Sequence, residues 1–239
     1  MNHTPAPKQD VTRLVDYIIE TGLVPVDLPP EYAYASLPLC IIDAVFSIGV
    51  RYAGVTATIQ RFCANTVWRV YGGDMANSGQ GERAITDLLA ILDGTKPENA
   101  AATLFGNRQR TSTRSGILKA EAVQRFARAL LNAGINTFED ITQPRLESAK
   151  PVILTIPGQK SGISFDYFQM LAGNDGLIKP DRMVQRFVAK ALEVTERDIP
   201  PARAVLLVQA AVLALNSQGH AWTPRGLDYV VWKRESDGA

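Results

Sequence analysis

A turn built on proline and glycine, between two stretches with helical periodicity, is the first feature of this sequence that could do chemistry. Residues 156–162 read Ile-Pro-Gly-Gln-Lys-Ser-Gly. A helix that begins after such a turn directs backbone N–H groups and a partial positive charge outward, and both favour a phosphate. Gly158 has no Cβ to obstruct an approaching backbone, and Lys160 adds a positive charge. The stretch therefore predicts a phosphate-binding hairpin, with a plain connecting turn as the alternative.

The second feature is Asp181, which lies 24 residues beyond Pro157 and directly after Pro180. The pattern that follows predicts a helix over 181–194. An aspartate at this position commonly caps the helix by accepting a hydrogen bond from a backbone N–H group. A carboxylate held there could also stabilise the positive charge that develops on a sugar when an N-glycosidic bond breaks, or activate a water molecule. From the residues alone, both roles stay open.

Together, the turn and the aspartate resemble the helix-hairpin-helix DNA glycosylase superfamily, which includes endonuclease III and the alkyladenine glycosylases. In that family a Leu-Pro-Gly-Val-Gly hairpin is followed, at about this distance, by Val-Asp-Thr-x-Val-x-Arg, whose aspartate is catalytic. Asp181 matches the aspartate, Val184 the apolar position and Arg186 the arginine. Residues 118–123 are similar to the Lys-Ala helix that precedes the family's hairpin, and residues 42–47 to its first barrel helix.

The resemblance implies an all-α fold of two helical lobes, with the helix-hairpin-helix motif at the cleft between them and Asp181 in that cleft. One lobe would combine residues 1–37 with 176–239, and the other, barrel-like, would span 38–175 with the hairpin at about 145–172. The implied function is monofunctional excision of a base from DNA, with Asp181 as the catalytic carboxylate. The residues expected to contact DNA are Pro157, Gly158, Gln159, Lys160, Gly162, Arg51, Tyr52, Arg114, Lys119 and Arg186.

The chain departs from the family's pattern at working positions. Gly162 stands where bifunctional members carry the lysine that forms a Schiff base, so strand cleavage by that route is not expected. Lys160 stands where the family usually has glycine. Gly49 stands where the family has the glutamine that fills the space left by a flipped base, so Arg51 or Tyr52 would do that work. These departures keep two alternatives open: a relative that binds DNA without catalysis, and a helical interaction module that binds no DNA.

Helical periodicity dominates the rest of the chain and must position these residues. One face of an N-terminal helix carries Leu14, Val15, Ile18 and Ile19. The strand-like run at 152–156 is rich in β-branched residues but ends at once in the Pro-Gly turn, so an isolated strand and the end of a helix are both open. Further helices are expected at about 37–52, 54–70, 82–93, 98–105, 117–133, 145–153, 161–172, 181–194, 201–216 and 224–233.

The composition limits the partners and cofactors that the chain could use. The net charge is +1 over 239 residues, so DNA binding would depend on a local basic patch. Two cysteines and two distant histidines predict neither a metal site nor the iron–sulfur cluster of endonuclease III, while a hairpin of this family leaves room for a monovalent cation. The start is polar and no apolar run reaches membrane-spanning length, which predicts a cytoplasmic monomer. The candidate patch precedes and opens the helix at 117–133 and consists of Arg108, Arg110, Arg114 and Lys119.

Overall fold

The structure is a computed structural model that describes residues 6–26, 28, 33–50, 52–72 and 81–237. Within these residues the chain is helical. Apart from two isolated bridges, Tyr34 to Tyr71 and Arg110 to Leu118, the described residues form no strand. The predicted all-α fold class is therefore confirmed. No helix in this part of the chain is both long and apolar enough to cross a membrane.

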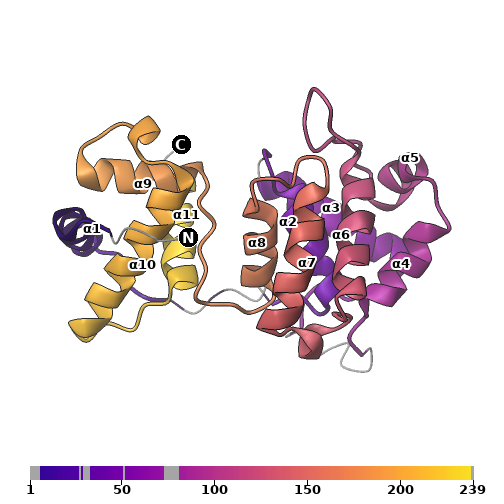
Figure 1. Cartoon of the computed structure of the whole chain (residues 1–239), viewed down its shortest axis with the longest axis horizontal. Coiled ribbons are helices and arrows are strands. Elements are labelled where there is room, and N and C mark those ends of the chain that lie inside the picture. The colour runs from indigo at the N-terminus through magenta and orange to yellow at the C-terminus, as the bar shows by residue number, and fades with distance from the viewer. Residues whose placement is uncertain (1–5, 27, 29–32, 51, 73–80, 238–239) are drawn as a thin grey trace. The chain divides into compact units, whose positions relative to one another are not determined.

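The chain divides into two compact units, whose helices are labelled in Figure 1. The first unit consists of residues 1–28 and 174–239, and the second of residues 29–173. The sequence predicts boundaries after residues 37 and 175. The first boundary comes earlier because Tyr34 bridges to Tyr71 and its hydroxyl donates to Asp43 Oδ2 at 2.8 Å. These contacts tie the segment around Tyr34 to the second unit.

The second unit surrounds a helix that is buried on every side. α2 (Leu37–Phe46) is fully buried because its sequence is apolar around the whole circumference apart from Asp43. It packs against α3 (Tyr52–Thr66), α6 (Lys119–Asn132) and α8 (Ile163–Leu171). The other elements of this unit are α4 (Ile85–Asp93), α5 (Pro97–Asn99), the π-helical turn η3 (Ala100–Leu104), the short η4 (Phe138–Asp140) and α7 (Gln143–Thr155).

Aromatic packing and an ion pair hold α7 and α8, the two helices that flank the Pro-Gly turn. The rings of Phe165 and Phe168 in α8 lie 6.3 and 5.5 Å from the ring of Phe126 in α6. In α7, the Lys150 ammonium lies 3.9 Å from Asp166 Oδ1 and 5.6 Å from the centre of the Phe165 ring. Because α8 is anchored to α6 and linked to α7, the turn between them starts and ends at fixed points.

The strand-like run that precedes the turn belongs to a helix. α7 continues to Thr155, and Ile156 then adopts an extended conformation with ψ 129°. Of the two structures that the sequence leaves open for 152–156, the end of a helix is therefore correct. Pro157 enforces this ending, because the residue before a proline is disfavoured in the helical region.

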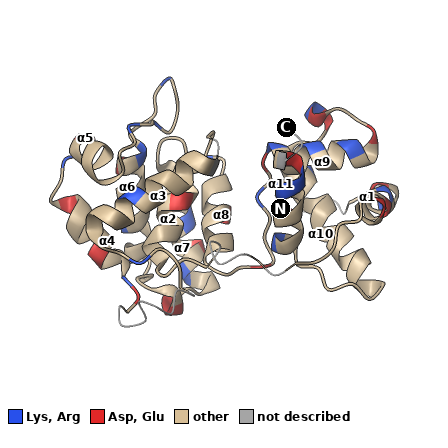
Figure 2. Cartoon of the chain, turned by 180° about the vertical axis from the view of Figure 1, so that it is seen from behind, with Lys and Arg blue, Asp and Glu red and all other residues tan. Residues whose placement is uncertain are grey.

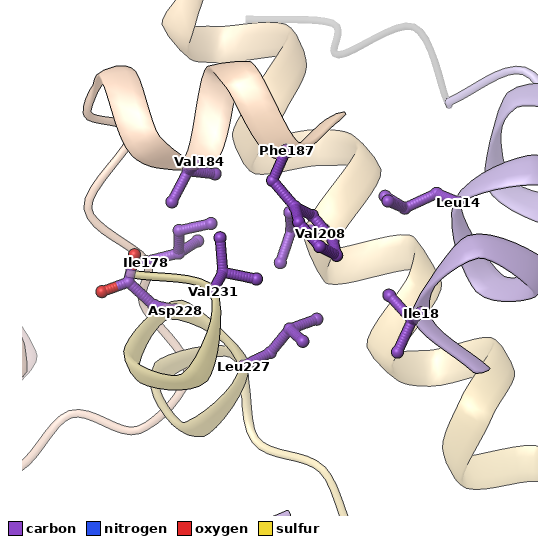
Figure 3. Close-up of a pocket in the computed structure, with 9 residues that line it drawn as sticks. All are labelled: Leu14, Ile18, Ile178, Val184, Phe187, Val208, Leu227, Asp228 and Val231. Atoms are coloured by element: carbon purple, nitrogen blue, oxygen red, sulfur yellow. The ribbon is translucent and has the colours of Figure 1, made fainter. Parts of the chain in front are cut away.

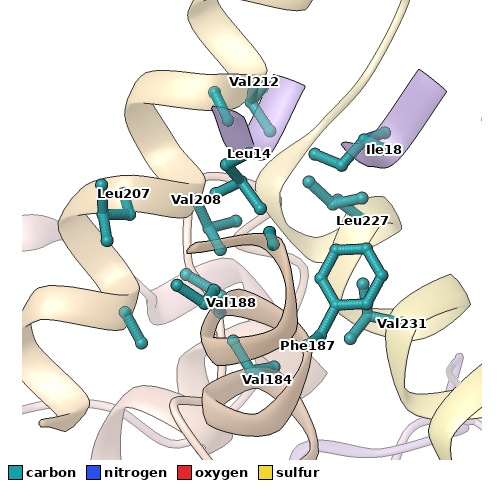
Figure 4. Packing of buried hydrophobic residues seen from close by; sticks show 14 of the residues in the cluster. Leu14, Ile18, Val184, Phe187, Val188, Leu207, Val208, Val212, Leu227 and Val231 are labelled. Atoms are coloured by element: carbon teal, nitrogen blue, oxygen red, sulfur yellow. The ribbon is translucent and has the colours of Figure 1, made fainter. Parts of the chain in front are cut away.

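The first unit packs α1 (Lys8–Glu20), α9 (Arg182–Leu192), α10 (Pro201–Ser217) and α11 (Pro224–Asp237) around one apolar core. The short η5 (Glu196–Asp198) joins α9 to α10. In α9 the apolar positions recur at helical spacing, so Val184, Phe187 and Val188 all enter the core, where Leu14 and Ile18 of α1 also lie (Figure 4). This packing fixes α9 and, with it, the aspartate at its start.

Candidate functional site

The Pro-Gly stretch forms a tight turn between two helices. α7 ends at Thr155 and α8 begins at Ile163. Inside the turn, the Gln159 N–H donates to the Ile156 carbonyl at 2.9 Å and the Gly162 N–H donates to the Gln159 carbonyl at 3.0 Å. Gly162, directly before α8, has φ +77°, a left-handed conformation that glycine adopts without strain. The predicted helix–turn–helix at 145–172 is present.

The outer surface of the turn offers donors to an anion. Lys160 and Ser161 are exposed. Within the described part of the chain, the backbone N–H groups of Gly158, Lys160 and Ser161 have no hydrogen-bond partner. Of these groups, the amides of Lys160 and Ser161 directly precede Gly162, the N-cap of α8, where the helix dipole adds a partial positive charge. Amides, dipole and ammonium together favour a phosphate.

Two residues of the turn, Gln159 and Gly158, have contacts within the protein that the sequence does not predict. The Gln159 side chain is buried, and its Oε1 accepts a hydrogen bond from the Ser164 hydroxyl. Gly158 has φ +86°, and a Cβ added to it would lie 2.5 Å from Thr111 Cβ. Thr111 of the chain's own loop therefore lies on the side of Gly158 where a side chain would be, while Gly158 itself stays exposed. The predicted contact of the Gln159 side chain with DNA is wrong, because that side chain faces the interior.

The loop that covers Gly158 carries most of the predicted basic patch. It folds back on itself: Thr111 N–H donates to Ile117 O at 2.9 Å, and Arg110 Nη1 donates to Gly116 O at 2.8 Å. Arg114, at the tip of this loop, is exposed. Lys and Arg residues are mixed with Asp and Glu in both units, so neither unit is uniformly basic (Figure 2). The contact of Thr111 with Gly158 links this loop to the hairpin.

Lys119 is not part of that surface, and its predicted contact with DNA is wrong. Its side chain is 2% exposed. Its Nζ donates to the backbone carbonyls of Phe46 and Ile48, each at 2.8 Å, and to Gln109 Oε1 at 3.4 Å. Lys119 therefore supplies donors to carbonyls at the C-terminal end of α2, which the helix itself leaves without partners.

Three other predicted residues have mixed outcomes. Arg51 lies outside the described residues, and Tyr52 begins α3 with a side chain that is not described. Arg186 lies on α9, and its Nε is 3.0 Å from Glu196 Oε1 while its Nη1 is 4.0 Å from Glu235 Oε2. This arginine is therefore part of an ion-pair group within the first unit.

Asp181 is the N-cap residue of α9. Its Oδ1 accepts hydrogen bonds from the N–H groups of Met183 and Val184, at 2.8 and 3.2 Å. Its Oδ2 has no hydrogen-bond partner among the described residues. The side chain is half-buried. One oxygen is thus fixed to the helix, while the other remains available.

A second carboxyl group, which the sequence analysis missed, lies beside Asp181. Asp228 is on α11, and its Oδ1 accepts from the Lys179 N–H at 3.2 Å. The Lys179 carbonyl in turn accepts from the Asp181 N–H at 2.7 Å, so Lys179 joins the two acids. Burial raises the pKa of Asp228 well above its ordinary value, and the negative charge of Asp181 raises it further, against the opposing charges of Lys179 and Arg225. The signal in the sequence that could have identified Asp228 is an acidic residue between the apolar residues 227 and 231 of a predicted helix.

The side chain of Asp228 borders the apolar core rather than an open cavity. Its neighbours form a narrow gap with no room for a water molecule, lined by Leu14, Ile18, Ile178, Val184, Phe187, Val208, Leu227 and Val231. Figure 3 shows the carboxyl oxygens at the edge of this group, beside Ile178 and away from Leu14 and Ile18. The stem of Asp228 therefore packs on the core, while its carboxyl group lies at the edge with Asp181.

Neither cysteine is a candidate nucleophile. Cys40 and Cys63 are both buried, and burial raises the pKa of the Cys63 thiol to about 12. At neutral pH such a thiol is almost entirely protonated, which makes it a poor nucleophile and a poor metal ligand. In the described ranges, no three His, Cys, Asp or Glu side chains come together in a way that could hold a metal ion.

Comparison with known proteins identifies the family of the chain but no function. Residues 12–236 match the family described as a domain of unknown function, DUF8548, and the chain belongs to this family. The match spans parts of both units. No curated protein and no solved structure matches the sequence.

Proposed function

We propose that this protein binds DNA through the α7–α8 hairpin and hydrolyses an N-glycosidic bond with Asp181 as the catalytic carboxylate. The observation that carries the proposal is that the two oxygens of the Asp181 carboxylate differ in their hydrogen bonds. Oδ1 is held by two amides of α9, while Oδ2 has no partner among the described residues. A carboxylate that is fixed in this way is already oriented to stabilise a positive charge that develops only during the reaction.

The chemistry explains why such an arrangement is useful. Breaking the bond between a base and deoxyribose leaves positive charge on the sugar, and a carboxylate beside the sugar lowers the energy of that state. The gain is largest when the group needs no reorganisation as the charge develops. Because Oδ1 is tied to Met183 and Val184, Oδ2 keeps one direction relative to α9.

Support for DNA as the partner comes from the hairpin of the second unit. Lys160 and the amides of Gly158 and Ser161 offer both charge and hydrogen bonds to a phosphate. Contacts of this kind hold the backbone without reading the sequence. The base must leave the duplex before it can react, so the protein would turn one nucleotide out of the stack.

The alternative is a DNA-binding protein without catalysis, and one observation favours it. The two hydrogen bonds at Asp181 Oδ1 are sufficient to explain the residue as a helix cap. In that case its charge would have no further role. The two proposals differ in what they predict for Asp181→Asn, because asparagine keeps an oxygen for the cap and loses the negative charge.

The test begins with duplex oligonucleotides that each contain one damaged or mismatched base. Wild-type protein should release at least one of these bases. On that substrate we expect Asp181→Asn to slow release by about 100-fold to 1,000-fold, with an unchanged melting temperature. Release at the wild-type rate by Asp181→Asn would contradict catalysis by Asp181. Absence of release from every oligonucleotide, together with DNA binding, would favour the alternative.

Binding is tested separately. Lys160→Glu should weaken binding to duplexes of any sequence and make the dependence of affinity on salt shallower by about one unit. The matched control is Lys96→Glu, which reverses another exposed lysine of the second unit, directly before α5. If both variants bind DNA as the wild type does, the hairpin is not the DNA-binding element.

A further inference from the structure

Asp228 lies in surroundings that favour a protonated carboxyl group. Its stem contacts the apolar group that contains Ile178, Leu227 and Val231. Its one hydrogen bond in the described structure comes from the Lys179 N–H, and no cation of the described residues lies within ion-pair distance of it. The nearby guanidinium of Arg225 is instead 3.1 Å from Asp175 Oδ1. A carboxylate without an ion pair, beside another carboxylate, is costly.

The backbone joins Asp228 to the reacting group. Lys179 donates its N–H to Asp228 and accepts the N–H of Asp181 with its carbonyl, so one residue positions both acids. Asp181 lies at the N-terminus of α9 and accepts hydrogen bonds from two amides, which favour negative charge there. An apolar group thus surrounds the stem of one carboxyl group while backbone amides hold the other in place, and two carboxyl groups in such different surroundings suit an acid and its partner.

We infer that Asp228 is a second catalytic residue of the proposed glycosylase: it holds a proton beside the Asp181 carboxylate and gives that proton to the leaving base. The inference rests on the proposed function of Asp181. Burial and the charge of Asp181 both raise the pKa of Asp228, and Lys179 and Arg225 are the cations that oppose this effect. Asp228 therefore keeps its proton to a higher pH than an ordinary aspartate.

The reaction is balanced with these two groups and one water molecule. The bond between C1′ of the sugar and the base nitrogen breaks, and its electron pair goes to the base. The proton of Asp228 goes to a ring nitrogen of the base. The oxygen of water bonds to C1′, and the proton that it loses goes to Asp181. Asp228 ends as a carboxylate and Asp181 as an acid, and proton exchange with solvent restores the starting pair.

This assignment defines a class of substrate. An uncharged base is a poor leaving group unless it is protonated, so an acid at the site speeds its release. A base that already carries positive charge from alkylation needs no added proton. The site should therefore act on uncharged damaged or mismatched bases, and the acid should matter for those bases only.

The experiment compares two probes, duplexes that contain either hypoxanthine, which is uncharged, or 7-methylguanine, which is cationic. Asp228→Asn should slow the release of hypoxanthine by about 100-fold to 10,000-fold and leave the release of 7-methylguanine unchanged. Asparagine can still accept the Lys179 N–H, and the melting temperature checks that the variant is folded. The matched control is Asp175→Asn, which changes another acid of the first unit, one that pairs with Arg225, and it should leave both reactions unchanged.

The pH dependence gives a second readout. Wild-type release of hypoxanthine should fall as pH rises and Asp228 loses its proton, and this fall should be absent from the residual activity of Asp228→Asn. Equal loss on both probes, no loss on either, or wild-type activity on 7-methylguanine alone would overturn the role of Asp228 and leave that of Asp181 standing. If wild-type protein releases neither base, nor any base of the wider set, the proposed function itself fails.

Discussion

Replacing Lys119 with methionine tests the structure at the point where it departs most from the sequence-based prediction. Methionine has a similar length and fills the buried path of the lysine stem. It removes the ammonium that donates to the carbonyls of Phe46 and Ile48 at 2.8 Å. The carbonyls at this end of α2 then lose their donor. If Lys119 instead contacted DNA from the surface, the same substitution would remove only a surface charge.

The expected loss of stability follows from those two hydrogen bonds. A buried polar group that loses its partner costs about 1–3 kcal/mol. Phe46 is 1% exposed, so its carbonyl should carry the full cost, whereas Ile48 is half-exposed and water can replace the lost donor there. We therefore expect Lys119→Met to lower the free energy of unfolding of the second unit by about 1–3 kcal/mol.

Urea unfolding gives the free energy, and hydrogen exchange of α2 and α6 peptides, with α10 of the first unit as reference, assigns the change to the second unit. The control is Arg125→Met on the same helix, where the arginine is half-exposed and pairs with Glu121; its effect should stay within about 0.5 kcal/mol. A Lys119→Met protein as stable as the wild type, with a shallower salt dependence of DNA binding, would refute the assignment.

Two further substitutions test the hairpin and the carboxyl pair. Gly158→Ala should destabilise more than Gly173→Ala in urea unfolding: both have positive φ, which costs about 1–2 kcal/mol for alanine, but only at Gly158 would the new Cβ lie 2.5 Å from Thr111. Equal losses would contradict this contact. Asp228→Asn should become progressively more stable than the wild type as pH rises above about 3.9, the ordinary aspartate pKa. The pKa of Asp228 is raised in the folded protein, so wild-type stability is highest at low pH and is lost as pH rises from the unfolded pKa through the folded pKa. A constant difference across pH would refute it.

Local pattern was sufficient to predict most helices and the hairpin. The run at Leu37–Phe46 is apolar on all sides, and the structure buries it completely. The Pro-Gly turn predicts a break between two helices, and α7 ends and α8 begins around it. These elements depend on neighbouring residues in the chain, so the sequence contains the information directly.

Long-range contacts decide what the sequence could not show. Lys119 looks like other basic residues of its segment, and only the position of the α2 C-terminus, 71 residues away at Ile48, makes it a buried donor. Gly158 similarly meets Thr111, and Asp228 meets Lys179 across 49 positions of chain. A charged residue in a polar segment is normally solvated, and no local pattern identifies the exception.

In the proposed function, the cap that Asp181 forms on α9 would assist catalysis by the same residue. A carboxylate that swings freely on a surface must be oriented as the sugar cation forms, and that reorganisation reduces its catalytic effect. The bonds from Met183 and Val184 supply the orientation beforehand. They also explain why Asp228 would keep its proton, because ionising it would place a second negative charge next to a carboxylate that cannot turn away. In the proposed reaction the cap therefore holds the Asp181 carboxylate in place, and Asp228 beside it supplies the proton.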